Sequence, residues 1–336
     1  MAENLYLHFP FCRARCSYCN LYSRARSTPA QRAGYVAALC DDISPTGRFA
    51  TVYFGGGTPA LCELEPILAK LRPLLAPDAE FTVELHPLDV TRELLETLRA
   101  GGVNRISMGV QSLDDAILAH MNRGYTFNEA ERAFYRVRER FDNVGIDLIV
   151  GYPGETAALL PRHARLAKWG LVHCSVYSLQ NERGLDRAVD DETVMNRLAV
   201  TAKFLEDIGL KRYEISNYAV PGRECRHNLA TWRGEDYVGL GEGAAGRVGL
   251  TRTKGVRTPG GIIAYETETV TPEYDRRERR LFQLRTREGI STEGFPEWIP
   301  ILEAHAGNGL LVKTGDRYRL TERGTEVCDS ILADLV

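Results

Sequence analysis

The stretch Leu5–Cys19, with the sequence LYLHFPFCRARCSYC, joins a short apolar run to three closely spaced cysteines. The apolar run Leu5–His8 is typical of a β-strand. Cys12, Cys16 and Cys19 follow it in a CxxxCxxC loop. In folds that alternate strands with helices, the loops after the strands carry the ligand-binding residues. We therefore expect the fold and the chemistry to be organised around this unit of strand and loop.

The first two thirds of the chain alternate predicted strands with predicted amphipathic helices. The strands are Leu5–His8, Thr51–Phe54, Phe81–Leu85, Arg105–Gly109, Gly145–Val150 and Cys174–Leu179, and the helices include Glu63–Leu75, Thr91–Ala100, Glu129–Phe141 and Thr156–Trp169. Strands separated by helices pair in parallel through right-handed crossovers. An open doubly wound sheet and a β/α barrel both fit this α/β pattern, and both bind ligands at the C-terminal ends of the strands.

Unusual residues follow or end four successive predicted strands. The cysteine loop follows the first strand, Gly55–Gly57 follow the second, Glu84 ends the third and Gln111 follows the fourth. Because parallel strands end at the same edge, we expect these residues to meet on one rim of the sheet.

The pattern changes after residue 222, which predicts a division into residues 1–222 and 223–336. The last sixty residues predict a helix, a helix, a hairpin and a helix, an order similar to a winged-helix module. The predicted hairpin pairs Gly309–Lys313 with Arg317–Leu320, and Thr321 is predicted to cap the final helix. Basic residues are not concentrated in this module, so we do not expect it to bind DNA.

Composition excludes several classes of function. The chain has 336 residues, and 42 basic against 45 acidic side chains give a net charge of −3. This balance does not predict a nucleic-acid partner. No apolar run reaches the roughly 18 residues of a membrane span, and Met1–Leu5 does not resemble the start of a signal peptide. We therefore expect a cytoplasmic protein, in which the eight cysteines form no structural disulfides.

The three clustered cysteines predict an iron–sulfur site. Zinc sites usually take four ligands, and the chain has no second cysteine pair. Three thiolates can instead hold three irons of a 4Fe–4S cluster and leave the fourth iron open to another ligand. A zinc site and incidental cysteines remain the alternatives at this point.

Several longer motifs resemble the radical S-adenosylmethionine (SAM) superfamily and, within it, the coproporphyrinogen dehydrogenase-like family (HemN/HemW). The resemblance implies a partial (β/α)6 barrel of the TIM type, with a 4Fe–4S cluster loop and a smaller C-terminal α+β domain that ends in a winged-helix-like module. It covers residues 5 to about 250, and more weakly the remainder. The matching motifs are Tyr6–Cys12, Tyr53–Pro59, Arg105–Ser112, Asn122–Arg123 and Ile146–Thr156.

The same resemblance implies the site residues. Cys12, Cys16 and Cys19 would hold the cluster, and Gly56, Gly57 and Thr58 would hold the methionine part of SAM, because glycine lets the backbone approach a ligand closely. No residue is assigned as catalytic, and the residues leave open whether SAM is cleaved. Further SAM contacts are implied for Tyr6, Tyr18, Glu84, Gln111, Arg123 and Asp147.

Within the family, the chain is more similar to the HemW-type heme chaperones than to the dehydrogenases. The dehydrogenases typically carry a further cysteine where this chain has Leu21, and they have a long N-terminal extension. The segment Cys225–Trp232 resembles the HNxxYW heme motif of the chaperones, which implies His227 as a heme ligand. Two residues depart from the chaperone pattern, Thr231 in place of tyrosine and Ala245 in place of histidine.

The resemblance thus implies a heme chaperone with a 4Fe–4S cluster, SAM and heme. Its partners would be heme, a heme-acceptor protein and a reductant such as flavodoxin or ferredoxin, and a homodimer and a peripheral membrane contact are compatible with it. An oxygen-independent coproporphyrinogen III oxidase-like enzyme and a HemN-like radical SAM methyltransferase are the alternative functions.

Overall fold

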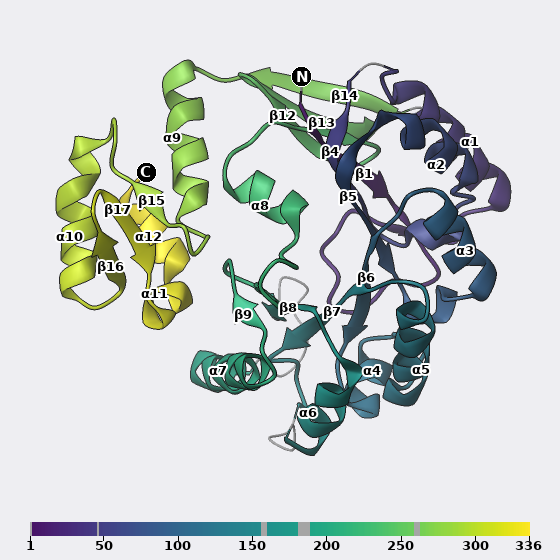
Figure 1. Cartoon of the computed structure of the whole chain (residues 1–336), viewed down its shortest axis with the longest axis horizontal. Coiled ribbons are helices and arrows are strands. Elements are labelled where there is room, and N and C mark those ends of the chain that lie inside the picture. The colour runs from purple at the N-terminus through teal and green to yellow at the C-terminus, as the bar shows by residue number, and fades with distance from the viewer. Residues whose placement is uncertain (1, 46, 156–159, 181–188, 259–262) are drawn as a thin grey trace.

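Six parallel strands in chain order form the centre of the fold (Figure 1). The strands are β1 (Asn4–Phe9), β4 (Phe49–Gly56), β5 (Leu75–Leu85), β6 (Arg105–Gln111), β7 (Asn143–Val150) and β8 (His173–Ser178). Each pairs with the next along the chain, so the sheet winds in one direction, as in a barrel and not as in a doubly wound sheet. The six predicted strands are therefore confirmed. The computed structural model describes residues 2–45, 47–155, 160–180, 189–258 and 263–336.

Helices cover the outer side of the curved sheet (Figure 1). Thr91 caps α3 as predicted, because its Oγ1 accepts a hydrogen bond of 3.1 Å from the N–H of Leu94. Residues 156–159 of the predicted helix Thr156–Trp169 lie outside the described residues. The helices are α1 (Pro29–Asp42), α2 (Glu65–Leu71), α3 (Arg92–Ala100), α4 (Asp115–His120), α5 (Phe127–Arg138) and α6 (Leu160–Leu166).

Both edges of the central sheet are extended by later strands. On the β8 side, β10 (Asn217–Ala219) and β9 (Lys211–Arg212) pair antiparallel. On the other side, β11 pairs in parallel with β1, and three antiparallel strands follow. The sheet thus contains residues from both sides of the predicted division at 222. The remaining elements of this region are β11 (Tyr237–Leu240), β12 (Ala245–Val248), β13 (Thr251–Arg257), β14 (Ile263–Thr269), α7 (Asp191–Asp207), α8 (Arg226–Trp232) and a small sheet of β2 (Phe11–Cys12) and β3 (Arg24–Ala25).

The C-terminal module has an apolar core of its own, which includes the buried residues Leu284, Trp298 and Ile331. The predicted hairpin is confirmed, and its turn uses Gly315 with φ of +62°. Thr321 caps a helix directly after the hairpin, but this helix is short and is followed by a second one, so the single final helix that the sequence predicts is divided in two. The elements of the module are α9 (Pro272–Gln283), β15 (Ile290–Ser291), α10 (Ile299–Gly307), β16 (Leu311–Thr314), β17 (Arg317–Leu320), α11 (Glu322–Glu326) and α12 (Cys328–Asp334).

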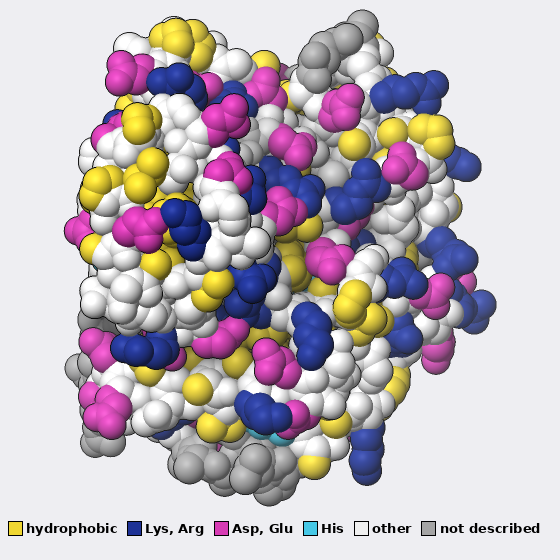
Figure 2. All heavy atoms as spheres, turned by 60° about the vertical axis from the view of Figure 1, so that its left-hand side comes forward, with side chains coloured by type: hydrophobic (Ala, Val, Ile, Leu, Met, Phe, Trp, Pro, Cys, Tyr) yellow, Lys and Arg dark blue, Asp and Glu magenta, His cyan; other side chains and the backbone are white. Residues whose placement is uncertain are grey.

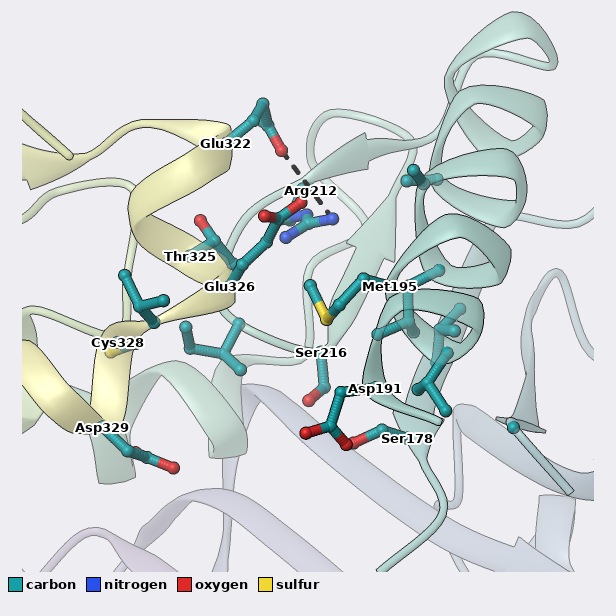
Figure 3. A pocket seen from close by; sticks show the side chains of 18 of the residues that line it. Ser178, Asp191, Met195, Arg212, Ser216, Glu322, Thr325, Glu326, Cys328 and Asp329 are labelled. Atoms are coloured by element: carbon teal, nitrogen blue, oxygen red, sulfur yellow. Dashed lines mark ion pairs between the residues drawn. The ribbon is translucent and has the colours of Figure 1, made fainter. Parts of the chain in front are cut away.

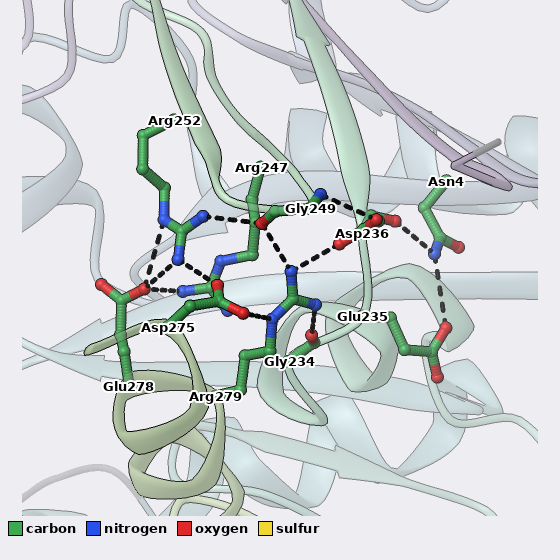
Figure 4. Close-up of polar contacts among 10 residues, drawn as sticks. All are labelled: Asn4, Gly234, Glu235, Asp236, Arg247, Gly249, Arg252, Asp275, Glu278 and Arg279. Carbon is green, nitrogen blue, oxygen red and sulfur yellow. Dashed lines mark hydrogen bonds and ion pairs between the residues drawn. The ribbon is translucent and has the colours of Figure 1, made fainter. Parts of the chain in front are cut away.

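An ion-pair network joins the sheet extension to α9 (Figure 4). Arg252 on β13 contacts Asp275 at 2.5 Å and Glu278 at 2.9 Å. Arg279 contacts the same Asp275 at 2.8 Å and Asp236 at 2.6 Å. Because these side chains are partly buried and share partners, the network is expected to stabilise the contact more than isolated surface pairs do.

We expect Arg252→Ala to lower the free energy of unfolding by about 1–3 kcal/mol, because two partly buried carboxylates lose a charged donor. Arg92→Ala is the control, since the Arg92–Glu96 pair lies on the surface with side chains 74% and 54% exposed. Loss of this exposed pair should lower the free energy of unfolding by clearly less than Arg252→Ala does. Denaturant unfolding measures both, and equal losses would contradict a role for the network.

The surface carries charges of both signs. On the face seen in Figure 2, Lys and Arg side chains are mixed with Asp and Glu side chains. No helix among the described residues is long and apolar enough to cross a membrane.

Candidate functional site

The inner face of the curved sheet is polar. On β1, Leu5, Leu7 and Phe9 belong to the main apolar core beneath the helices. Tyr6, which alternates with them, points to the other face, where its ring lies 6.1 Å from that of Tyr53 on β4. TIM barrels usually fill this space with branched apolar side chains. A polar interior is therefore suited to holding a ligand.

Sequence reasoning missed several members of this polar face. Tyr53 donates a hydrogen bond of 2.8 Å to Oε1 of Glu84, and Ser107 donates one of 3.1 Å to Oδ1 of Asp147. The alternation of polar with apolar residues in each strand was the signal that could have found them. The additional polar residues at these alternate positions include His8, Tyr53, Thr82, Arg105, Ser107, Ser175 and Tyr177.

The three predicted cluster cysteines are free and half-buried. Burial raises the pKa of the Cys12 thiol, the neighbouring Cys19 and Cys16 raise it further, and a hydrogen bond with Thr58 lowers it. Among the described residues, no three His, Cys, Asp or Glu side chains converge on a single metal ion. A 4Fe–4S cluster requires three thiolates that bind three different irons, so three neighbouring but separate thiols suit it as a donor set.

Arg123 ties the cysteine loop to the end of β6. Its Nη1 donates to Sγ of Cys16 at 3.3 Å and to the hydroxyl of Tyr18 at 3.2 Å, and its Nη2 donates to the carbonyl of Gly109 at 2.8 Å. The guanidinium is buried, so its charge acts on the thiol with little screening by solvent. The structure thus brings Tyr18 and Arg123 together with the cysteines.

The glycine turn after β4 packs against the cysteine loop. A Cβ at Gly57 would lie 2.6 Å from the carbonyl oxygen of Phe11 and 2.9 Å from Sγ of Cys12, so no other residue fits there. Gly56 has φ of +106°, a conformation that favours glycine. Its N–H donates to Oε2 of Glu84 at 3.2 Å. The turn therefore joins the cysteine loop to the carboxylate of β5.

Glu84 and Asp147 place two carboxyl groups inside the sheet. Burial raises the pKa of Glu84 to about 7, and the charge of Asp147 raises it too. Burial also raises the pKa of Asp147, against hydrogen bonds from Ser175 and Ser107 that lower it. The Asp147 residue is half-buried, and the hydroxyl groups of Ser107 and Ser175 are its hydrogen-bond partners. Neither carboxyl group forms an ion pair with a described residue, so both are suited to bind a ligand's ammonium group or hydroxyl groups.

Gln111 adopts an unusual backbone conformation at the end of β6. Its φ is +68°, and the pairing of β6 with β7 is irregular between Gly109 and Gln111. A Cβ at Gly109 would lie 2.6 Å from Nε2 of Gln111. The side-chain amide of Gln111 therefore lies close to the backbone of Gly109. Arg123 donates a hydrogen bond to the carbonyl of this same glycine. Strained residues held by surrounding contacts are concentrated at ligand sites.

His227 lies at the opposite end of the strands from the cysteine loop. Its side chain is on α8, the residue is 6% exposed, and its Nδ1 is 2.8 Å from Oγ1 of Thr51, near the start of β4. Glu80 at the same end of β5 accepts hydrogen bonds from the N–H groups of Arg226 and His227, at 3.0 and 3.1 Å. The structure does not bring His227 together with the cysteine loop.

Three further observations concern His227 and its motif. Burial lowers the pKa of His227 to about 4, and nearby Arg105 lowers it too, so the imidazole is neutral. No described residue hydrogen-bonds its Nε2. Thr231, where the chaperone pattern has tyrosine, donates to the carbonyl of His227 at 3.1 Å, and Ala245 is exposed on β12. Heme would reach this imidazole only after α8 moved.

A cleft of about 890 Å³ lies between α7, β9, β10 and the helices α11 and α12 (Figure 3). Met195 and Asp191 line it from α7, and Arg212 forms an ion pair of 3.7 Å with Glu322 across it. None of the site residues predicted from the sequence lines this cleft.

Comparisons with known proteins show which family this chain resembles. The family model of the radical SAM superfamily matches residues 6–167. Heme chaperone HemW of Mycobacterium tuberculosis is 35% identical over 99% of this chain and 94% of its own length. Heme chaperone HemW of Bacillus subtilis is 31% identical over 99% of this chain and 100% of its own.

A solved structure shares the fold. That of coproporphyrinogen III oxidase (HemN) from Escherichia coli, a radical SAM enzyme, superposes with a TM-score of 0.84 over 99% of this chain and 89% of the other, at 21% identity. This identity supports the fold alone, whereas the relatives named above match along their whole length at higher identity. This chain therefore belongs to the radical SAM superfamily and, within it, to the family of the HemW proteins.

Proposed function

We propose that this protein is a heme chaperone that carries a 4Fe–4S cluster and SAM and transfers heme to an acceptor protein. The observation that carries the proposal is the 35% identity, over 99% of the chain, to a protein named a heme chaperone. The rim formed by the cysteine loop, the glycine turn and the inner carboxyl groups supports it.

In this proposal, Cys12, Cys16 and Cys19 hold the cluster. When bound, a cluster with one open iron would supply a ligand position for SAM. The turn Gly56–Thr58 binds the methionine part of SAM, and Arg123 holds the loop closed by its contacts with Cys16 and Tyr18.

The remaining proposed contacts of SAM come from the inner face. Glu84 and Asp147 accept hydrogen bonds from its ammonium and hydroxyl groups, Gln111 contacts it with a side-chain amide, and Tyr6 borders it. The partners are heme, an acceptor protein and a reductant such as flavodoxin or ferredoxin, in the cytoplasm. A homodimer and a peripheral membrane contact remain compatible with this function.

The test is anaerobic reconstitution followed by separate titrations with heme and SAM. The chaperone function predicts heme bound at one per chain and its passage to apomyoglobin, used as a heme-free acceptor, with SAM recovered intact. A protein that binds no heme but converts SAM to S-adenosylhomocysteine and a methylated product would instead be a methyltransferase.

We propose His227 as the axial heme ligand, reached after α8 moves. We expect His227→Asn to lose the Soret band of the heme complex, because it removes the imidazole but keeps a polar atom near the Thr51 hydroxyl. Absorption titration under anaerobic conditions measures this.

His120→Ala is the control, since His120 is exposed on α4. It should bind heme as the wild type does. If His227→Asn binds heme with unchanged stoichiometry and an unchanged Soret maximum, His227 is not the ligand, and a group on the open face of the molecule must hold the iron.

A further inference from the structure

Ser17, which directly follows Cys16 in the cysteine loop, is held by residues from outside the loop. Its backbone N–H donates to the carbonyl of Met121 at 3.3 Å, and its hydroxyl donates to the carbonyl of His120 at 3.1 Å. Both carbonyls belong to the connection that follows α4. This connection therefore fixes the loop directly beside its second cysteine.

A third contact of Ser17 comes from the turn that follows β7. The hydroxyl groups of Ser17 and Tyr152 lie 2.8 Å apart. A serine hydroxyl has a single proton, and the carbonyl of His120, which can only accept, uses the proton of Ser17. Tyr152 is therefore the donor of this hydrogen bond. Tyr152 is 3% exposed, and its ring packs in a small apolar cluster with Ile117 and Met121.

The turn that carries Tyr152 is tied to α7 by an ion pair. Oε2 of Glu155 accepts hydrogen bonds from the N–H of Gly151 at 2.8 Å and from Nη1 of Arg197 at 3.0 Å. Nη2 of Arg197 donates to the backbone carbonyl of Glu155 at 2.7 Å. The side chains of Glu155 and Arg197 are 8% and 17% exposed, so solvent screens the pair little. The turn is therefore closed on itself and anchored to a helix.

The position of Ser17 gives the Tyr152 hydroxyl a consequence for two cysteines. Ser17 lies between Cys16 and Cys19, and the thiols of both are half-buried. A group that fixes the backbone between two ligands limits where those ligands can move. If Tyr152 only filled space, its ring would be sufficient and its hydroxyl would have no effect on the loop.

We propose that Tyr152 is a positioning residue for the cysteine loop, and that its hydroxyl holds Cys16 and Cys19 in place through Ser17. Glu155 and Arg197 act one step further away, because they fix the turn from which Tyr152 reaches the loop. This inference rests on the proposed function in one respect, since the loop is taken to hold the cluster.

The experiment compares the wild type with Tyr152→Phe, which keeps the ring and removes the hydroxyl. Tyr318→Phe is the control, because Tyr318 is 1% exposed and its hydroxyl donates to Glu303 at 2.7 Å in the C-terminal module. Each protein is prepared without iron and in reduced form. The rate at which each loop thiol reacts with iodoacetamide is then measured by mass spectrometry of the peptides.

Tyr152→Phe should make Cys16 and Cys19 react about 2- to 10-fold faster, the range that loss of one neutral hydrogen bond gives to a local opening equilibrium. Tyr318→Phe should leave both rates unchanged. In the iron-loaded proteins, release of iron to a chelator should be faster in Tyr152→Phe by a similar factor, because release also requires the loop to open.

Substitutions at position 17 test whether Tyr152 acts through Ser17. Ser17→Ala should raise the thiol rates at least as much as Tyr152→Phe does, whereas Ser17→Thr, which keeps the hydroxyl, should not. The double variant Ser17→Ala/Tyr152→Phe should react no faster than Ser17→Ala, because the second substitution removes a donor whose acceptor is already gone.

Equal thiol rates in Tyr152→Phe and the wild type would overturn the proposal, as would a double variant that reacts faster than Ser17→Ala. The same acceleration in Tyr318→Phe would also overturn it, because the cause would then be a general loss of stability. The proposed function is tested separately by the metal. A chain that takes up no iron refutes the cluster, whereas an iron-loaded chain with unchanged thiol rates in Tyr152→Phe refutes only the role of Tyr152.

Discussion

Replacing Cys12, Cys16 and Cys19 together with alanine will abolish iron and sulfide uptake during anaerobic reconstitution, together with the visible absorption expected of such clusters. The three thiols are half-buried on one loop, and the turn at Gly57 packs within van der Waals contact of Cys12. The expected effect is a complete loss, because a cluster held by three protein ligands has no substitute for them. Iron and sulfide analysis and absorption spectra measure it.

A second triple variant provides the control. Cys40, Cys62 and Cys328 are free cysteines outside the CxxxCxxC loop, and their replacement by alanine removes the same number of thiols. This protein should take up iron as the wild type does. If both triple variants lose iron equally, or if the loop variant retains it, the assignment of the cysteine loop is wrong.

Glu84→Gln is expected to weaken SAM binding by about 10- to 100-fold, because a charged hydrogen bond contributes about 1.5–3 kcal/mol. Glu84 is held by Tyr53 and by the N–H of Gly56, so the carboxylate is aimed into the polar interior. Glutamine has nearly the same shape, but it has no charged carboxylate oxygens that could accept hydrogen bonds from SAM. Calorimetric titration of SAM into the anaerobic, cluster-loaded protein measures the change.

The same substitution should change the pH dependence of stability. The folded pKa of Glu84 is raised from 4.5 to about 7. Its contribution to stability is therefore full below pH 4.5 and is lost as the pH rises through 7. Glutamine does not titrate and therefore shows no such loss. The Tm of apo Glu84→Gln minus that of the wild type should be about 2–4 °C higher at pH 8 than at pH 5.

Glu63→Gln removes one negative charge from an exposed position and is the control for both measurements. It should leave the affinity for SAM and the pH dependence of Tm unchanged. If Glu84→Gln binds SAM as tightly as the wild type does, Glu84 does not bind the ammonium or hydroxyl groups of SAM. A flat difference in Tm between pH 5 and pH 8 would contradict the raised pKa.

Local sequence was sufficient to place the six central strands and the rim residues. Apolar runs such as Ile146–Val150 decide strand formation locally, and parallel pairing then brings their ends together. This is why Glu84 meets the glycine turn and why Gln111 lies at the same edge as Arg123. The positive φ of Gln111 could not be predicted, because it accompanies an irregular pairing with Leu148 on the neighbouring strand β7.

The far end of the sheet required the tertiary structure. Sequence reasoning connected His227 with heme through a motif, but its contacts with Thr51 and Glu80 join residues more than 140 positions apart. The pairing of β11 with β1 also crosses the predicted division at 222. Neither contact leaves a periodic signal in the chain.

The sequence by itself determined the class of fold, the cysteine loop and the family, because these depend on local runs of residues and on fixed spacings. Only the tertiary structure decided which polar groups share the interior, since a half-buried carboxyl group such as Glu84 owes its raised pKa first to removal from water and then to the charge of Asp147 on another strand. Burial also decided that His227 is enclosed, whereas Leu21 and Tyr22 are exposed. Local sequence determines backbone preferences, whereas the environment of a side chain depends on segments that meet only in the folded chain.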